Sequence, residues 1–280
     1  MVGSVSSGWR DFWARGRWWT AVLIVVVYLG LYLLAGLGLG RIFGHLVDNQ
    51  NIFATPASVF FGIGAPLVVG AILLSAFVAS LGWWRPIFAR QPLRGRWWMW
   101  IFVVFAVAPV VLRLFGIDYG SYGAGVVPMA FFVGLLIGFT EELLYRGIVV
   151  KILRDGGHRE WMVAVVSSLL FALSHTVNLL SGQPLVTVAV TVVFTFGFGM
   201  MMYLVMRATG NIIWAMLLHA FTDPTTFLAS GGIDASNGAA HNPILDLAAP
   251  FNMLFVAAAL IAMVLIRGKA PSQPQQLVQA

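Results

Sequence analysis

The stretch FTEELLYRGIVVKI, residues 139–152, places three ionisable side chains inside a run of otherwise apolar residues. Glu141 and Glu142 are adjacent, and Arg146 follows Glu142 by four positions. Charged groups at the depth of a bilayer cost free energy, so they are retained where they form a site, line a pathway or pair with one another. The stretch therefore predicts a membrane-spanning helix that carries a polar site.

The composition of the 280-residue chain is that of an integral membrane protein. Hydrophobic residues make up 60% of the sequence and charged residues only 9%, unlike a soluble globular domain. Apolar runs of about 20 residues, the length that a helix needs to cross a bilayer, recur along the chain. We therefore predict an all-α fold, a polytopic bundle of about eight transmembrane helices that forms one integral membrane domain over residues 1–280. The predicted spans lie near residues 18–40, 57–83, 97–115, 126–151, 161–180, 185–206, 211–229 and 247–266.

The charged residues outside the spans alternate in sign from loop to loop. Lys and Arg gather before the first span and after the second, fourth, sixth and eighth spans. The other loops carry Asp48, Asp118, Asp234 and Asp246. Because cytoplasmic loops are enriched in Lys and Arg, both termini are predicted to be cytoplasmic. The net charge of +6 then reflects topology, and no nucleic-acid partner is expected.

Two segments flank the predicted bundle. Residues 9–19, WRDFWARGRWW, mix Arg with Trp and predict an interfacial anchor at the membrane surface. Residues 267–280 form a short polar tail that is expected to be disordered. The abundance of Arg, Ala and Gly is common in GC-rich bacteria, so the expected location is a bacterial plasma membrane, which the chain crosses several times.

Strongly polar groups within the spans concentrate in the second half of the chain. Arg41 and Arg113 are set apart because they lie near predicted span ends. The remaining groups are Glu141, Glu142 and Arg146 in the fourth span, His175 in the fifth, and His219 and Asp223 in the seventh. The four-residue spacing of Glu142 and Arg146 puts them on one helix face and predicts a structural ion pair. Glu141 points about 100° away from Glu142 and can face a different neighbour.

The depths of these groups agree. At 1.5 Å per residue, Glu141 lies about 15 Å, His219 about 13 Å and His175 about 20 Å from the predicted cytoplasmic boundary. A common depth on three helices predicts one shared site. Asp223 precedes Pro224, so the seventh span is expected to kink or unwind there and open backbone groups toward a cavity.

Three short motifs in these spans resemble those of the CPBP intramembrane proteases. That family comprises the CAAX prenyl endopeptidases and bacteriocin-processing or abortive-infection relatives. The motifs occur in the family's order, within a predicted catalytic core of about residues 125–225: Glu141-Glu142-x-x-x-Arg146, Phe171-x-x-x-His175 and His219-x-x-x-Asp223. The last position of the third motif is Asn or Asp in the family, and Asp223 brings a charge that Asn would not.

The resemblance implies an intramembrane endopeptidase that acts on a peptide or membrane-protein substrate within the lipid bilayer. Glu141, aided by His175, would activate a water molecule, and His219 with Asp223 would form the oxyanion hole. This glutamate mechanism requires no cofactor. The motif residues are expected to surround one water-accessible cavity that opens to the cytoplasmic side, with Asp223 at its edge.

Other readings of the same residues remain. A zinc-dependent protease would use Glu141, His175, His219 and Asp223 as ligands, although no HExxH pair is present. A transporter also keeps ionisable residues within its spans, but such folds usually show paired repeats, and here the polar groups occupy one half of the chain. A non-catalytic immunity or binding protein that keeps the scaffold is the third alternative.

Overall fold

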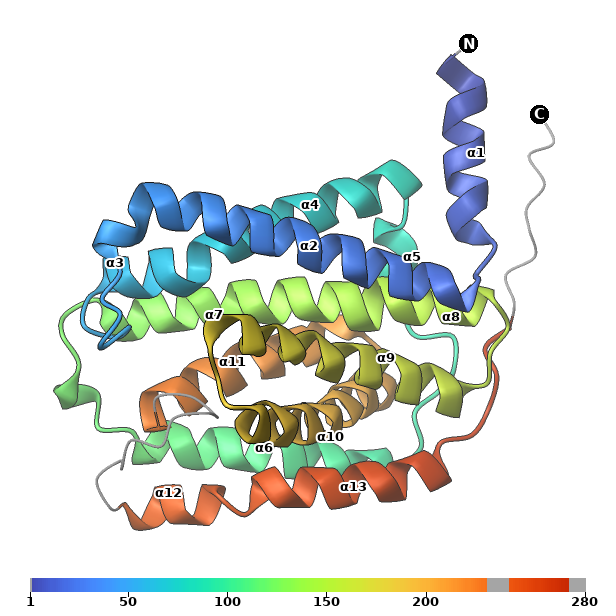
Figure 1. The fold of residues 1–280 in the computed structure, drawn as a ribbon. Helices are drawn as coiled ribbons and strands as arrows, with labels where there is room; N and C mark the ends of the chain where they lie inside the picture. Colours follow the sequence, from blue (N-terminus) through green and yellow to red (C-terminus); the bar gives the residue numbers. More distant parts are fainter. Residues whose placement is uncertain (1, 231–241, 272–280) are drawn as a thin grey trace.

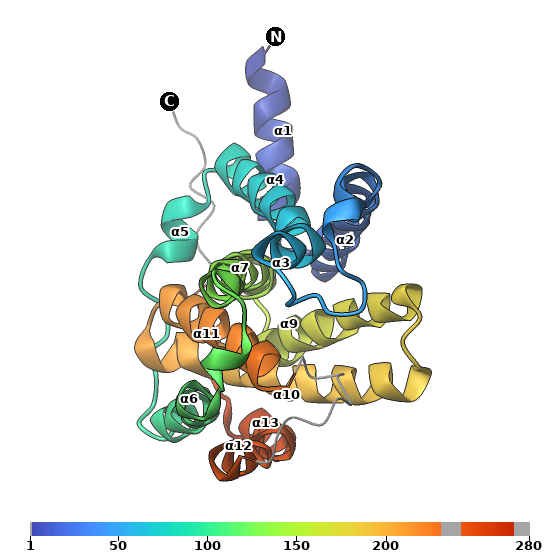
Figure 2. The same ribbon diagram turned by 90° about the vertical axis from the view of Figure 1, so that its left-hand side faces the viewer.

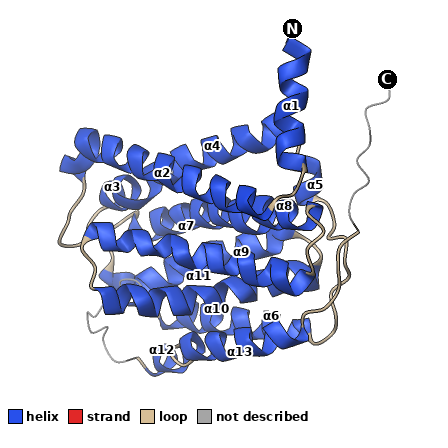
Figure 3. Ribbon diagram, turned by 45° about the vertical axis from the view of Figure 1, so that its right-hand side comes forward, coloured by secondary structure: helices blue, strands red, loops and turns tan. Residues whose placement is uncertain are grey.

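The computed structural model describes residues 2–230 and 242–271. Within these ranges the fold is helical without strands, and one isolated bridge pairs Arg159 with Lys269 (Figure 3). Eight helical segments in the described part of the chain are long and apolar enough to cross a membrane, which confirms the predicted all-α polytopic bundle. They are Trp18–Leu46, Pro56–Leu81, Met99–Gly116, Val126–Asp155, Glu160–Ser181, Leu185–Thr209, Ile212–Ala229 and Pro243–Leu265.

Several of these segments contain more than one helical element. The longer α-helices are α1 (Val2–Ala14), α2 (Trp18–Phe43), α4 (Ala65–Leu81), α6 (Met99–Gly116), α7 (Val126–Glu142), α9 (Glu160–Ser174), α10 (Leu185–Thr209), α11 (Ile212–Ser230) and α13 (Phe251–Leu265). The short elements are η1 (Gly44–Leu46), α3 (Pro56–Val59), η2 (Phe60–Gly64), α5 (Trp84–Phe88), η3 (Tyr119–Ser121), η4 (Leu143–Val149), α8 (Val150–Asp155), η5 (His175–Ser181) and α12 (Pro243–Ala248). Asp234 and residues 272–280 of the predicted polar tail lie outside the described residues.

The spanning segments run side by side and give the bundle two distinct ends (Figure 1). We call one the basic end, because it carries the connections at residues 84–98, 155–160 and 207–211, which contain Arg85, Arg90, Arg94, Arg96, Arg159 and Arg207. The opposite end carries residues 44–55 and 182–184. These two ends provide the frame in which the depth of each polar group can be compared.

The helix α1 lies at a steep angle to the spanning helices, beside the basic end (Figure 1). Trp13 is buried, and its ring centroid lies 4.9 Å from that of Phe77 in α4. The indole Nε1 of Trp9 donates a hydrogen bond of 3.1 Å to Ser80 Oγ. This is the placement expected of an interfacial segment that combines Arg and Trp.

The helix α7 lies near the middle of the bundle when the molecule is viewed along its spans (Figure 2). It packs most extensively against α11, and it also contacts α4 on its other side. The helix α10 packs against α9, α11 and α13, and α6 packs against α10 and α11. The fourth, fifth and seventh spans, which carry the motifs, are thus brought together around α7 and α10.

Close approach of α7 to α11 depends on two glycines spaced four residues apart. A Cβ atom at Gly138 would meet the backbone of Met216 and Ala220, and one at Gly134 would meet the Ala220 carbonyl and the ring of Pro224. Small residues at this spacing let two helix backbones come together in a membrane, where van der Waals packing replaces the hydrophobic effect as the driving force. This contact sets Glu141 and Glu142, one turn further along α7, beside α11.

The expected opening of the seventh span at Pro224 is not observed. The helix α11 continues through this proline from Ile212 to Ser230. Proline has no N–H, so it cannot bond the carbonyl of Ala220 four residues earlier. That oxygen faces Gly134 of α7 instead. The backbone group that proline releases is therefore used in helix packing and does not line a cavity.

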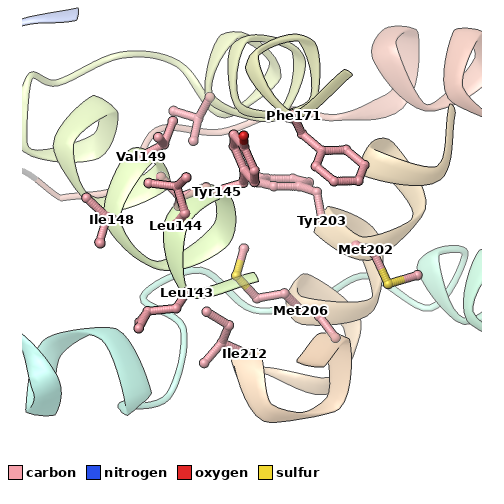
Figure 4. Close-up of a cluster of buried hydrophobic side chains, with 14 of the residues drawn as sticks. Leu143, Leu144, Tyr145, Ile148, Val149, Phe171, Met202, Tyr203, Met206 and Ile212 are labelled. Carbon is pink, nitrogen blue, oxygen red and sulfur yellow. The ribbon is translucent and has the colours of Figure 1, made fainter. Parts of the chain in front are cut away.

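The fourth span changes its helical form directly after Glu142. Leu143–Val149 form the π-helical segment η4, whose side chains are all buried. Figure 4 shows Tyr145 of this segment beside Phe171 and Tyr203 within a cluster of buried apolar side chains. A π segment within an α-helix frequently marks a functional position. Here it lies between Glu142 and the rest of the span, and its side chains pack into the core.

A second buried polar cluster ties the basic ends of α8, α9 and α10 together. Arg154 donates to both carboxylate oxygens of Glu160, at 2.8 Å from Nε and 2.9 Å from Nη2. Arg207 Nη1 donates to Glu160 Oε2 at 2.7 Å, and the hydroxyl of Tyr203 donates to the same oxygen. Arg154 and Arg207 follow the fourth and sixth predicted spans, where basic residues are expected at the membrane surface, yet their side chains are buried. Both are buried because they satisfy one carboxylate at a helix N-terminus.

Candidate active site

The motif residues come together at the level where α7 passes α11. Glu141 and Glu142 end α7, Arg146 lies in η4, and His175 begins η5 at the end of α9. His219 and Asp223 lie one turn apart on α11, with their side chains toward α7.

The Glu142 carboxylate is fully buried, and one of its oxygens has two partners. Arg146 Nη1 donates to Glu142 Oε1 at 2.9 Å, so the structure contains the ion pair that the four-residue spacing indicates. His219 Nδ1 lies 2.8 Å from the same oxygen. Arg146 also donates from Nη2 to the carbonyl of Gly199 at 2.8 Å, and its guanidinium lies 4.8 Å from the ring centroid of Phe171. This arrangement joins the fourth, sixth and seventh spans through one buried ion pair.

Both nitrogens of the His219 imidazole face carboxylates, and two aromatic rings pack against the imidazole. Its Nε2 lies 3.7 Å from Glu141 Oε2 and 3.6 Å from Asp223 Oδ1. The rings of Phe198 and Phe171 meet it edge-on, with centroids at 4.8 Å and 5.9 Å. An ionised Glu142 can only accept, so the hydrogen of the Nδ1–Glu142 bond belongs to the imidazole. The ring is therefore oriented with Nδ1 toward the buried ion pair and Nε2 toward Glu141 and Asp223.

His175 is oriented by its own helix. Its Nδ1 lies 3.1 Å from the carbonyl of Phe171, one turn earlier, and its ring packs edge-on against the Phe171 ring with centroids 5.0 Å apart. A carbonyl oxygen can only accept, so Nδ1 carries the hydrogen of that bond. In the neutral ring this leaves Nε2 as the nitrogen with a lone pair, the form that can accept a proton.

One cavity of about 330 Å³ is lined by Glu141, His175, His219 and Asp223. The side chains of Glu141 and Asp223 are 27% and 23% exposed, whereas that of Glu142 is completely buried. The difference separates the two adjacent glutamates. Glu141 faces the cavity, whereas Glu142 does not line the cavity and contacts Nδ1 of His219.

The cavity extends in the direction opposite to the expected one. Beyond the motif residues it is lined by Asn178 and Gln183 between α9 and α10, by Ile63 of η2 and by Phe227 near the end of α11. All of these lie toward the opposite end of the bundle, not toward the basic end. The expectation of a cavity that opens on the side of the basic loops is therefore wrong. Depth counted along a helix gives the level of a side chain but not the direction in which space is left between helices.

Several lining residues come from spans without motifs. Tyr32 of α2 and Phe198 of α10 both face the cavity, as do Thr191 and Thr195 of α10. Aromatic and threonine side chains in an apolar run are usual in packed helices, so no sequence signal marked them. The contact between α7 and α11, by contrast, does have a sequence signal. Gly134 and Gly138 of α7 are four residues apart, and small residues at this spacing predict close helix contact.

The same residues are also the candidate ligands of a metal site. In the described ranges, 2–230 and 242–271, no group of three or more His, Asp or Glu side chains is arranged to hold a metal ion. The residues of the zinc alternative therefore do not form a recognisable coordination site in this geometry.

A match to a known family covers the part of the chain that carries the motifs. Residues 123–225 match the family model described as type II CAAX prenyl endopeptidase Rce1-like. No curated protein and no solved structure matches the chain. The matched segment includes the motif residues Glu141, Glu142, Arg146, His175, His219 and Asp223. Residues 123–225 of the chain thus form an Rce1-like type II CAAX prenyl endopeptidase domain, which is the domain of the CPBP family.

Proposed function

We propose that this protein is an intramembrane endopeptidase in which Glu141 activates the attacking water. The observation that carries the proposal is the shared cavity, to which Glu141, His175, His219 and Asp223 all contribute. A volume of about 330 Å³ with mostly apolar walls and a few convergent polar groups is typical of a site that binds part of a substrate.

In the first step Glu141 removes a proton from water, and the water oxygen forms a bond to the carbon of the scissile carbonyl. The electron pair of the carbonyl moves to its oxygen. His175 orients the water by accepting a hydrogen bond from it at Nε2, while Glu141 takes the proton. In the second step the bond from carbon to nitrogen breaks, and the proton held by Glu141 passes to the leaving amine.

The developing oxyanion is stabilised by His219. Because Nδ1–H donates to Glu142, a donor at Nε2 requires a doubly protonated ring. Carboxylates on both sides of the ring favour that charged form, since opposite charges at close range stabilise each other in a medium of low dielectric constant. Preorganised donors of this kind typically contribute about 10²–10³-fold to turnover. Asp223 positions Nε2 at the edge of the cavity.

The proposal is tested with purified protein in liposomes and two internally quenched peptides, one farnesylated at a CAAX sequence and one unmodified with a transmembrane segment. Glu141→Gln should fold and lose about 10²–10⁴-fold in turnover, the usual contribution of a general base. Arg41→Gln, at an exposed position in α2 that does not line the cavity, is the control and should cleave like the wild type. A folded Glu141→Gln protein with wild-type turnover would remove Glu141 from the mechanism.

A chelator arm addresses the zinc alternative. Turnover should survive 1,10-phenanthroline, because no step needs a metal. Loss of turnover that added zinc restores would replace the glutamate mechanism with a metal-dependent one.

A further inference from the structure

A second cavity lies at the basic end of the bundle. It has a volume of about 170 Å³ and shares no lining residue with the cavity that holds the motif residues. Its walls come from α5 and the connection after it, from η4 and α8, and from Ala270 and Pro271. The buried side chains of Ile87 and Arg146 form its inner part, whereas Arg90 and Pro271 are exposed at its mouth. Liquid water takes about 30 Å³ per molecule, so this space admits a group larger than one water.

Basic side chains dominate the lining of this second cavity. The lining contains one carboxylate, that of Asp155, and four cations: Arg90, Arg146, Lys151 and Arg154. Lys151 Nζ lies 2.8 Å from Asp155 Oδ2, so these two charges balance each other. Within residues 2–230 and 242–271, the side chain of Arg90 has no hydrogen bond or ion pair. The charge at the mouth is therefore not offset by the described part of the chain.

The two buried arginines of the cavity leave a further positive charge. Arg146 pairs with Glu142, which balances one guanidinium. Arg154 shares the single carboxylate of Glu160 with Arg207, so two guanidinium groups face one negative charge. Even with every carboxylate counted as ionised, five basic side chains stand against three acidic ones among the lining residues and their ion-pair partners. A hollow with an excess of one charge and low-dielectric walls attracts a ligand of the opposite charge.

The guanidinium of Arg146 also has an unused donor. Its Nη1 and Nη2 donate to Glu142 and to the carbonyl of Gly199, but Nε has no hydrogen-bond partner among the described residues. Arg146 is only 2% exposed, and a buried donor without an acceptor is destabilising. Because Arg146 lines the second cavity, an acceptor oxygen held there is the candidate partner of Nε–H. The excess of positive charge and the buried donor both suit an anion.

The second cavity lies at the level expected for lipid headgroups. Trp84 of α5, and Trp97 and Trp100 near the start of α6, are exposed at the basic end. Tryptophans gather where a membrane meets water, and α1 lies beside the same end of the bundle (Figure 1). Basic cavities between spans at this level bind the headgroups of anionic lipids.

We propose that the second cavity binds the phosphate group of an anionic phospholipid. Arg90 and Lys151 contact the phosphate at the mouth, and Arg146 Nε donates to it from the inner end. A guanidinium presents several N–H groups to phosphate oxygens, and an ammonium adds a point charge. The site is separate from the cavity of the proposed protease, and binding there does not depend on proteolysis.

The test measures the lipid that the purified protein retains in detergent. Native mass spectrometry counts the molecules of phosphatidylglycerol and of phosphatidylcholine that are bound at increasing lipid concentrations. Both lipids carry a phosphodiester, but the choline cation cancels its charge. One phosphatidylglycerol molecule should bind about tenfold more tightly than the first phosphatidylcholine, because basic residues attract only the lipid with a net negative charge. It should also raise the unfolding temperature, as any ligand of the folded state does.

The variants remove charge from the mouth of the cavity. Arg90→Gln, at an exposed position, should weaken the binding of phosphatidylglycerol about fivefold, the usual attraction of one basic residue for an anionic lipid surface. The double variant with Lys151→Gln should bind it more weakly still. Arg94→Gln is the matched control, because Arg94 is an exposed arginine of the same connection that does not line the cavity. It should bind the lipid like the wild type, and unfolding without lipid checks that each variant is folded.

Three results would overturn the proposal: retention of neither lipid, equal retention of both, or equal phosphatidylglycerol binding by Arg94→Gln and the double variant. Inorganic phosphate, compared with chloride at equal ionic strength, tests a soluble source of the same group. A higher unfolding temperature in phosphate, with no phosphatidylglycerol retained, would assign the cavity to a free anion in place of a lipid.

Discussion

His219 Nδ1 lies 2.8 Å from Glu142 Oε1, the oxygen that also accepts a hydrogen bond from Arg146. This contact gives the two adjacent glutamates different roles. Glu142 fixes the orientation of the imidazole and neutralises a buried guanidinium, whereas Glu141 faces the cavity from the other side of the same ring. Two adjacent positions of α7 thus have different roles: Glu142 supports the structure of the site, and Glu141 is the group proposed to act on water.

Glu142→Gln should destabilise the protein far more than Glu141→Gln. The amide cannot neutralise Arg146, and breaking a buried ion pair by removal of one partner typically costs about 3–5 kcal/mol. Glu141 is partly exposed in the cavity and makes no contact with Arg146 of that kind. Thermal unfolding in detergent measures the difference, with circular dichroism as the probe. Equal losses for the two variants would mean that their roles are misassigned.

Gly138→Ala should separate α7 from α11. The added Cβ would meet the backbone of Met216 and Ala220, which cannot move aside as a flexible side chain can. Overpacking of this kind typically costs about 1–3 kcal/mol, and the displacement should also lengthen the contact between His219 and Glu142. Gly38→Ala is the matched control in α2, because no atom lies within 4 Å of its added Cβ. A Gly138→Ala protein as stable and active as Gly38→Ala would show that the close contact is dispensable.

Glu160→Gln should destabilise the basic end of the bundle without any direct effect on the proposed chemistry. It would leave Arg154 and Arg207 buried with a neutral partner, at a cost of about 3–5 kcal/mol. Asp155→Asn removes the more exposed ion pair to Lys151 and should cost about 1 kcal/mol or less. The measurement is the unfolding temperature of each variant, together with turnover at a temperature where both are folded. A smaller loss for Glu160→Gln than for Asp155→Asn would contradict the buried network.

The spans and the buried ion pair could be predicted from the sequence, because both depend on local signals. Apolar runs of sufficient length determine the spans, and the spacing of Glu142 and Arg146 determines which side of the helix they share. The π segment at Leu143–Val149 was not predicted, since it depends on how the fourth span packs against its neighbours. The same holds for the course of α11 through Pro224, where contact with α7 takes up the released carbonyl.

The burial of Arg113 and the direction of the cavity were missed for a related reason. Position along a span suggests that Arg113 lies near the surface, yet α6 is covered there by α11 and α12. Polar groups at one level indicate a site, but only the packing of side chains determines where space remains. Tyr32 and Phe198, which complete the cavity wall, belong to spans whose sequence carries no motif.

The side from which substrate reaches the site follows from the topology and the cavity together. The basic loops predict that the basic end is cytoplasmic, and the cavity extends toward the opposite end, near Asn178 and Gln183. We therefore expect the cleaved segment to enter from the extracytoplasmic side. The chain has no cysteine, so single cysteines can be introduced without background labelling. In intact cells a membrane-impermeant maleimide should label Ser181→Cys, and should label His158→Cys only after the membrane is permeabilised. The same reagent on Asn178→Cys should reduce turnover by blocking the cavity. Labelling of His158→Cys and not of Ser181→Cys in intact cells would invert the topology and place the cavity on the cytoplasmic side.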